Sequence, residues 1–191
     1  MIEDAIDRIV NEWKRQRPEL DVSATEVLQR ITRIYLLQAT SFAEVFGDYG
    51  LTFGEYEVLA ALRRSDPPHQ MKPTELIAAL VLSSGAVTNR IDQVEEAGLV
   101  RRLPDPGDRR GTLVRLTERG LELVDRAVLS HLDNEERLLS GLNRTDRDQL
   151  AALLRRLLLS SPFADISPER PRTDGRGTDG SAARRRSPRR R

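Results

Sequence analysis

The chain has 191 residues, of which 38% are hydrophobic and 32% charged, and its formal net charge is +1. This length fits one domain of ordinary size, with enough apolar side chains for a core beneath a charged surface. The absence of Cys excludes disulfides and thiolate chemistry, and His69 and His131 are the only imidazoles for a catalytic or metal site.

The N-terminus predicts an amphipathic helix over residues 2–15 rather than an export signal. Four large apolar side chains recur there at spacings of four, three and four, which places them on one helical face: Ile2, Ile6, Ile9 and Trp13. No run of the chain approaches the roughly 18 apolar residues that cross a bilayer. We therefore expect a cytoplasmic protein without a membrane partner.

Two helices follow this segment. Ser23 and Glu26 form a capping-box pattern that opens a long helix over residues 23–46, which carries more apolar side chains than one packed face needs. Thr52 and Glu55 repeat the pattern and open the next helix, which ends in the loop RSDPPHQ.

The middle of the chain predicts a helix-turn-helix followed by a wing. Pro73 opens a short helix, and Ser83 or Ser84 caps the next helix, which ends at Gly98. The runs LVRRL and TLVRL then flank the loop 104–111 and predict a two-stranded hairpin. The predicted fold class is therefore mainly α, a winged helix-turn-helix lobe over residues 52–117 with a small β-hairpin wing and a helical dimerisation region.

The remaining chain predicts two helices and a tail. Thr117 caps a helix over residues 118–140, and Thr145 with Asp148 opens a Leu-rich helix over residues 146–159, so that one domain spans residues 1–163. The segment 164–191 holds nine Arg and four acidic residues, a net charge of +5, and leaves the preceding residues at −4. It has almost no aliphatic content, so we expect a disordered basic tail that either attracts a polyanion or has no specific role.

Two groups of side chains are placed for contact with double-stranded DNA. The start of the second helix of the helix-turn-helix would face the major groove through Ser84, Gly85, Ala86, Thr88 and Asn89. At the wing tip, Arg109 and Arg110 would enter the minor groove, with the Asp108 carboxylate holding the Arg110 guanidinium in a bidentate pair. The alternative for the tip is a solvated hairpin stabilised by its own ion pairs.

These motifs resemble those of the MarR family of bacterial transcription regulators. The run TELIAALVLSSGAVTNRIDQVEEAGLVRRLPDPGDRRGTLVRLTERG carries the resemblance, and its DxR wing followed by LTxxG is among the family's most specific marks. The likeness spans roughly residues 25–160 and implies an obligate homodimer that straddles a palindrome. Independently, the surplus apolar surface on helices 23–46, 118–140 and 146–159 requires a partner chain.

The extra N-terminal helix resembles that of the family's urate-responsive subclass. The resemblance implies an anion site made of four side chains, Trp13, Glu57, Arg90 and Arg102, with Glu57 where subclass members typically have Asp. A flat purine anion suits an indole face and guanidinium donors. Each residue also has a plain structural alternative: a packing role for Trp13, a phosphate contact or ion pair for Arg90, a strand surface for Arg102 and a salt bridge for Glu57.

The sequence thus predicts a repressor, without a cofactor, that urate or a related purine-pathway anion releases from its operator. One alternative is a regulator of another effector, such as a phenolic acid, an antibiotic or a small carboxylate. Another is a constitutive architectural DNA-binding protein that uses the basic tail. We do not expect an enzyme, because the sequence has no nucleophile elbow, no Gly-rich phosphate loop and no acids at metal-ligand spacing.

Overall fold

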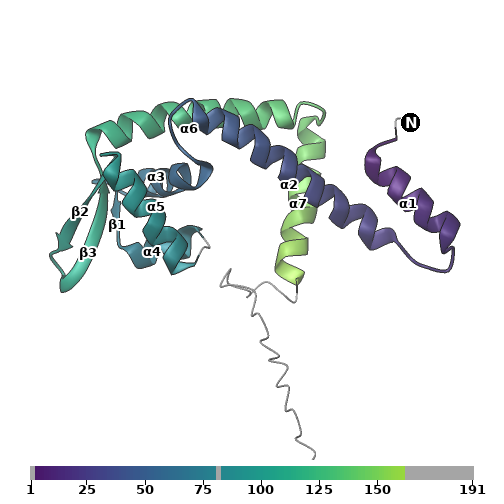
Figure 1. Cartoon of the computed structure of the whole chain (residues 1–191), viewed down its shortest axis with the longest axis horizontal. Helices are drawn as coiled ribbons and strands as arrows, with labels where there is room; N and C mark the ends of the chain where they lie inside the picture. The colour runs from purple at the N-terminus through teal and green to yellow at the C-terminus, as the bar shows by residue number, and fades with distance from the viewer. Residues whose placement is uncertain (1–2, 81–82, 162–191) are drawn as a thin grey trace, which may run out of the picture.

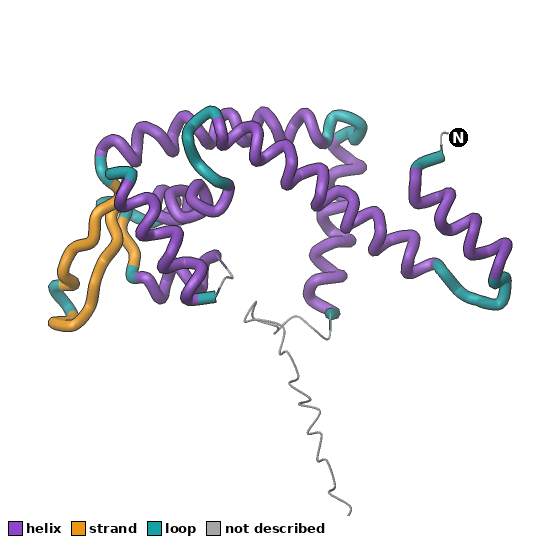
Figure 2. Tube along the Cα trace, in the orientation of Figure 1, coloured by secondary structure: helices purple, strands orange, loops and turns teal. Residues whose placement is uncertain are grey.

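The computed structural model describes residues 3–80 and 83–161. Within these ranges the chain is mainly helical with a small antiparallel sheet, which confirms the predicted fold class (Figures 1 and 2). The predicted tail 164–191 and Ile2 lie outside the described residues. No helix in the described part of the chain is long and apolar enough to cross a membrane.

Helix α1 (Ala5–Gln16) packs against the first half of α2 (Ser23–Gly47). Asp4 caps α1 in a capping box with Asp7, and both carboxylates bind the Arg30 guanidinium of α2, with Nε–Oδ2 and Nη2–Oδ1 distances of 2.9 and 2.6 Å. Ile6 is buried, whereas Trp13 remains 47% exposed. Helix α1 is therefore held by both an apolar strip and a charge cluster.

The helix starts correct part of the sequence prediction. Thr52 and Glu55 form the expected capping box at α3 (Phe53–Arg64). The box predicted at Ser23 and Glu26 is wrong, because the Ser23 N–H donates to the Asp21 carboxylate and α2 starts without a side-chain cap.

The start of α7 (Arg144–Ser160) also differs from the prediction, which placed the cap at Thr145 and Asp148. Asn143 is the cap and forms its box with Asp146. A side-chain acceptor one position upstream of the helix takes the first free amides, so the helix begins two residues earlier than predicted.

The winged lobe consists of α3, α4 (Pro73–Leu80), α5 (Ser84–Glu96) and a sheet of three strands in the order β1-β3-β2. Strands β2 (Val100–Asp105) and β3 (Asp108–Leu116) form the predicted hairpin, longer than expected, with Arg102 opposite Val114. Strand β1 (Gln70–Met71) was not predicted and pairs with β3. Two residues are too few to show the alternation that identifies a strand.

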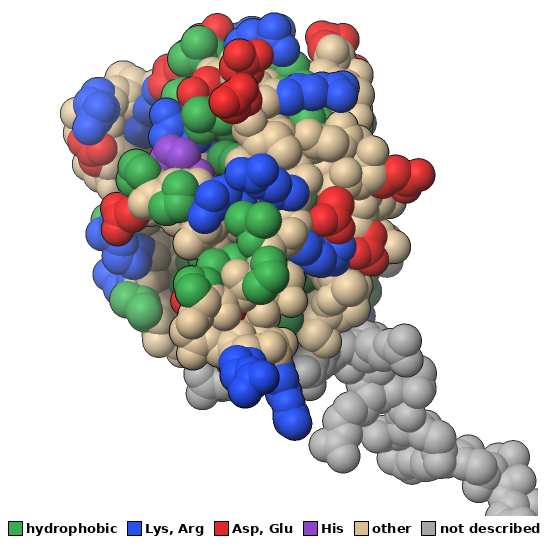
Figure 3. All heavy atoms as spheres, turned by 90° about the vertical axis from the view of Figure 1, so that its left-hand side faces the viewer, with side chains coloured by type: hydrophobic (Ala, Val, Ile, Leu, Met, Phe, Trp, Pro, Cys, Tyr) green, Lys and Arg blue, Asp and Glu red, His purple; other side chains and the backbone are tan. Residues whose placement is uncertain are grey.

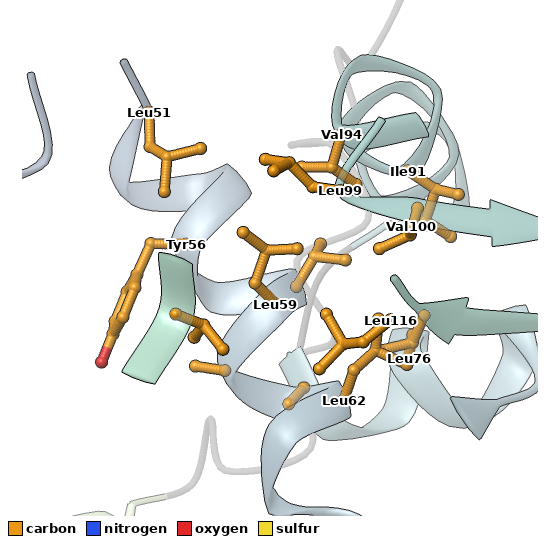
Figure 4. Close-up of a cluster of buried hydrophobic side chains, with 14 of the residues drawn as sticks. Leu51, Tyr56, Leu59, Leu62, Leu76, Ile91, Val94, Leu99, Val100 and Leu116 are labelled. Carbon is orange, nitrogen blue, oxygen red and sulfur yellow. The ribbon is translucent and has the colours of Figure 1, made fainter. Parts of the chain in front are cut away.

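Helix α3 occupies the centre of this lobe. It packs against α4, α5 and α6 (Glu118–Leu138), and its buried side chains meet those of the other elements in one apolar cluster (Figure 4). The labelled members come from α3 and its N-terminal approach (Leu51, Tyr56, Leu59, Leu62), α4 (Leu76), α5 (Ile91, Val94) and the turn and strands (Leu99, Val100, Leu116). This cluster fixes α5 and the sheet on one rigid support.

Helices α2, α6 and α7 lie outside the winged lobe together with α1; α2 and α6 are side by side, and α7 extends away from them (Figure 1). No residue of α7 is buried. Between α2 and α7 lies a mainly apolar groove of about 650 Å³, lined on α2 by Val27, Ile31 and Ile34 and on α7 by Leu150, Leu153, Leu154 and Leu157. We refer to these seven side chains as the α2–α7 face.

Candidate nucleic-acid interface and effector site

The first turns of α5 present polar side chains on the exposed side of the helix. Ser83 caps the helix, because its side chain accepts the Ala86 N–H at 3.4 Å. The residues predicted to contact DNA follow this cap, with Ser84, Gly85, Thr88 and Asn89 exposed and Ala86 partly buried. The helical period turns Val87 and Ile91 toward the core instead. The cap and the packed face together set which side chains α5 offers to a partner.

The wing tip places Asp108, Arg109 and Arg110 on the surface. Among the described residues no ion pair joins Asp108 to the predicted Arg110 guanidinium, and the Asp108 carboxylate instead accepts the Arg110 backbone N–H at 3.0 Å. A short carboxylate reaches the amide two residues on more readily than a distant guanidinium. Within residues 3–80 and 83–161, the guanidinium groups of Arg109 and Arg110 have no ion-pair partner. Figure 3 views this end of the molecule and shows basic side chains spread over it with acidic ones between.

A second carboxylate, which sequence reasoning missed, fixes the wing. Asp105 has a side chain only 8% exposed, and its Oδ2 lies 2.9 Å from Nζ of Lys72, the residue that precedes α4. Its Oδ1 accepts the Gly107 N–H at 2.8 Å. A Cβ on Gly111 would lie 2.9 Å from the Asp105 Cβ, so glycine is needed for the wing to close over this side chain. The Lys72–Asp105 pair therefore ties the base of the wing tip to α4.

The Lys72–Asp105 pair shifts the pKa of both residues. The hydrogen bond from Lys72, followed by that from the Gly107 amide, lowers the pKa of Asp105, and the Asp105 carboxylate in turn raises the pKa of Lys72. The pair is therefore fully charged across the neutral range. The only sequence signal for it was the acid-turn-acid pattern DPGD, which does not tell which of the two acids turns inward.

Arg102 joins the wing to α5. Its Nη2 lies 2.6 Å from the Asp92 carboxylate and its Nη1 contacts the Glu95 carboxylate, which also accepts the Arg102 backbone N–H at 2.9 Å. Strand β2 is thus fastened to the C-terminal half of α5 through side-chain and backbone contacts.

An ion pair between Glu57 and Arg90 joins α3 to α5. The Arg90 Nη1 donates to the Glu57 Oε2 at 3.2 Å, and the two side chains are 26% and 30% exposed. The structure thus brings two of the four predicted effector residues together, while Arg102 pairs elsewhere on α5. Trp13 lies on α1, at the opposite end of the molecule from α5 and the wing (Figure 1).

The exposed first turn of α5 lies beside a wing whose Arg109 and Arg110 have no ion-pair partner among the described residues, which is the arrangement of a winged helix-turn-helix. A family profile described as the MarR family matches residues 49–111. The transcriptional regulator PecS of Dickeya dadantii is 36% identical over 152 residues, which cover 80% of this chain and 92% of PecS. The chain belongs to the MarR family of DNA-binding transcriptional regulators.

Solved structures agree with this assignment. A variant of MarR from E. coli, complexed with operator DNA, is 25% identical with a TM-score of 0.63, and the match covers 76% of this chain and 97% of that one. BpsR of Bordetella bronchiseptica is 27% identical with a TM-score of 0.62, and the match covers 69% of this chain and 98% of BpsR. The BpsR structure concerns the regulation of its DNA binding by 6-hydroxynicotinic acid.

The buried wing carboxylate leads to a test. We expect Asp105→Asn to speed hydrogen exchange at the Gly107 amide about five- to tenfold, because a neutral acceptor makes a weaker bond than a carboxylate. Folding stability should also fall at neutral pH, as measured by urea unfolding. Since the pKa of Asp105 is lowered on folding, this difference should disappear as the pH falls through that lowered value, where the wild-type carboxyl is also neutral.

Asp133→Asn, at an exposed position of α6, is the matched control and should change neither quantity. If the stability difference between the wild type and Asp105→Asn persists unchanged at acidic pH, the charge of the Asp105 carboxylate does not cause it.

Proposed function

We propose that this protein is a homodimeric repressor that binds a palindromic operator and is released by a small flat anion, urate or a related purine-pathway compound. The observation that carries this proposal is the Glu57–Arg90 pair, because it joins the central helix α3 to the helix that presents the predicted DNA contacts. A ligand that alters the pair changes the position of α5.

For the DNA contacts, we assign the first turns of α5 to the major groove and the wing to the minor groove. Asn89 is suited to the edge of an adenine, and Thr88 to a phosphate or a thymine methyl. Arg109 and Arg110 would follow the electronegative minor groove, with Asp108 shaping the turn that carries them. Their lack of ion-pair partners among the described residues leaves both guanidinium groups available for phosphates.

For the homodimer, we assign the interface to α2, α6 and α7. An isolated helix of 17 residues without a buried side chain gains little from packing, and the leucines of α7 are 37–79% exposed. A second copy that covers the α2–α7 face would bury four of them, Leu150, Leu153, Leu154 and Leu157. Such a dimer also sets the spacing of two α5 helices on a palindrome.

For the effector, we assign the space around Glu57 and Arg90. An anion is attracted by the guanidinium and repelled by the carboxylate, so it separates the pair and shifts α5 relative to α3. The ligand acts through its different affinities for the DNA-competent and incompetent positions of α5, with a coupling of about 1–3 kcal/mol.

Trp13 and Arg102 do not lie beside the Glu57–Arg90 pair in one protomer, so each needs a further condition to contact the anion. Arg102 is already bound by Asp92 and Glu95, so an anion would have to compete with these two carboxylates. Because α1 and α5 lie at opposite ends of the protomer, Trp13 joins the anion site only if the second protomer supplies it.

A second candidate is a regulator of a different aromatic acid. BpsR, whose DNA binding is regulated by 6-hydroxynicotinic acid, supports this candidate. The same Arg90 guanidinium suits a carboxylate as well as an oxopurine anion. Competition between the two ligands separates the candidates.

The dimer is tested with Leu153→Glu in the full chain. We expect the dissociation constant of the dimer to rise more than about 30-fold, because burial of one leucine contributes about 2 kcal/mol. Sedimentation equilibrium would give a mass near the 21.6 kDa of one chain, against twice that mass for the wild type. Leu20→Glu, at an exposed leucine outside these helices, is the control. A Leu153→Glu variant that stays dimeric would remove α7 from the interface.

The wing is tested with Arg110→Ala, using an operator selected from a random duplex library by the wild-type protein. We expect weaker binding and a salt slope less steep by about 0.9 for each arginine removed, because fewer counterions are released. Arg144→Ala, at an α7 side chain 89% exposed, should leave the slope unchanged. An unchanged slope in Arg110→Ala would count against a wing that touches the backbone.

The effector is tested by titrating the fluorescence of Trp13, the only tryptophan, with urate, xanthine, 6-hydroxynicotinic acid and salicylate. We expect saturable quenching by urate and a 5- to 150-fold loss of operator affinity at saturation. Trp13→Ala should keep operator binding and lose the response to urate. Release by 6-hydroxynicotinic acid alone would favour the second candidate, and no release by any of the four would remove this ligand class.

A further inference from the structure

Gly54 stands where the Arg90 guanidinium meets α3. This glycine is buried at the second position of α3, directly after Phe53 and one turn before Glu57. A Cβ built on it would lie 2.5 Å from Arg90 Cζ, 2.8 Å from Nη2 and closer still to Nε. The guanidinium therefore occupies the space that any side chain at position 54 would fill.

The three nearest atoms to that Cβ all belong to Arg90, at the far end of a flexible side chain. By contrast, a Cβ on Gly47, at the end of α2, would meet nothing within 4 Å. A methyl group at position 54 is thus accommodated by moving the guanidinium rather than the backbone of α3.

The contact decides where the Arg90 guanidinium lies. Arg90 sits on α5 immediately before the buried Ile91, and the atoms that it places nearest to Gly54 are those of its flexible guanidinium end. The guanidinium lies over Gly54 and reaches Glu57 at 3.2 Å from that position. Without the open surface of a glycine, the same rotamer cannot form.

We propose that Gly54 is a positioning residue that sets the allosteric balance of this regulator. Because glycine has no side chain, the Arg90 guanidinium fits against α3 at this position and reaches Glu57. Any larger residue at position 54 displaces the guanidinium from Glu57, as a bound anion would. This inference rests on the proposed role of the Glu57–Arg90 pair in operator binding and ligand response.

The inference is tested with Gly54→Ala, assayed on the selected operator. We expect the operator affinity to fall about fivefold or more, within the usual range of allosteric coupling. The melting temperature should not fall, because alanine favours a helix more than glycine does. Gly47→Ala receives the same methyl group at an open position and should match the wild type.

A double-mutant cycle with Arg90→Ala separates positioning from a general structural effect. With the guanidinium removed, position 54 has room for a methyl group, so Gly54→Ala should change operator affinity less than about twofold in the Arg90→Ala background. If Gly54→Ala lowers the melting temperature, the Arg90→Ala change should restore it. Additive losses of affinity, or a melting defect that Arg90→Ala does not restore, would overturn the inference.

Urate is the ligand used to test the effector response. Because urate is proposed to favour the DNA-incompetent state, Gly54→Ala should also bind urate more tightly than the wild type does. Wild-type affinity of Gly54→Ala for the operator would overturn the role of Gly54, whatever urate does. A wild-type protein that ignores urate would instead count against the proposed effector, and the operator cycle would still decide the role of Gly54.

Discussion

The position of α5 is the constraint on which the rest of this regulator depends. Its inner face, with Val87, Ile91 and Val94, is buried in the core, which fixes the helix on the lobe. Its ionic contacts involve partly exposed side chains and come from Glu57 of α3 and from Arg102 of β2. The apolar contacts therefore secure the fold, while the ionic contacts are suited to set the exact placement of the side chains proposed to face DNA.

This division has an energetic reason. Burial of one aliphatic side chain contributes about 1.5–3 kcal/mol, whereas a surface ion pair contributes at most about 1 kcal/mol. A ligand with a coupling of about 1–3 kcal/mol cannot overcome several buried side chains, but it matches one or two ion pairs. An ionic fastening of α5 is thus the kind of contact that a small anion is able to change without unfolding the lobe.

Periodicity and turn residues were sufficient to predict the helices of the lobe, the hairpin and the family marks, because each depends on local sequence. The contacts that orient the site were harder to predict. The sequence analysis singled out Asp108 in the wing, whereas the carboxylate that turns inward is Asp105, because it pairs with Lys72, more than 30 positions away. Strand β1 depends likewise on its pairing with β3 rather than on its own two residues.

In a single protomer, two helices keep apolar side chains exposed: α7 has no buried residue, and α1 has a half-exposed Trp13. Both lie away from the winged lobe (Figure 2). The lobe is complete in itself, because its core, its wing and both fastenings of α5 come from one chain. In the proposed homodimer, a second chain would therefore contribute little to the folding of the winged lobe. Its physical role would be to space two winged lobes and to cover the helices that one protomer exposes.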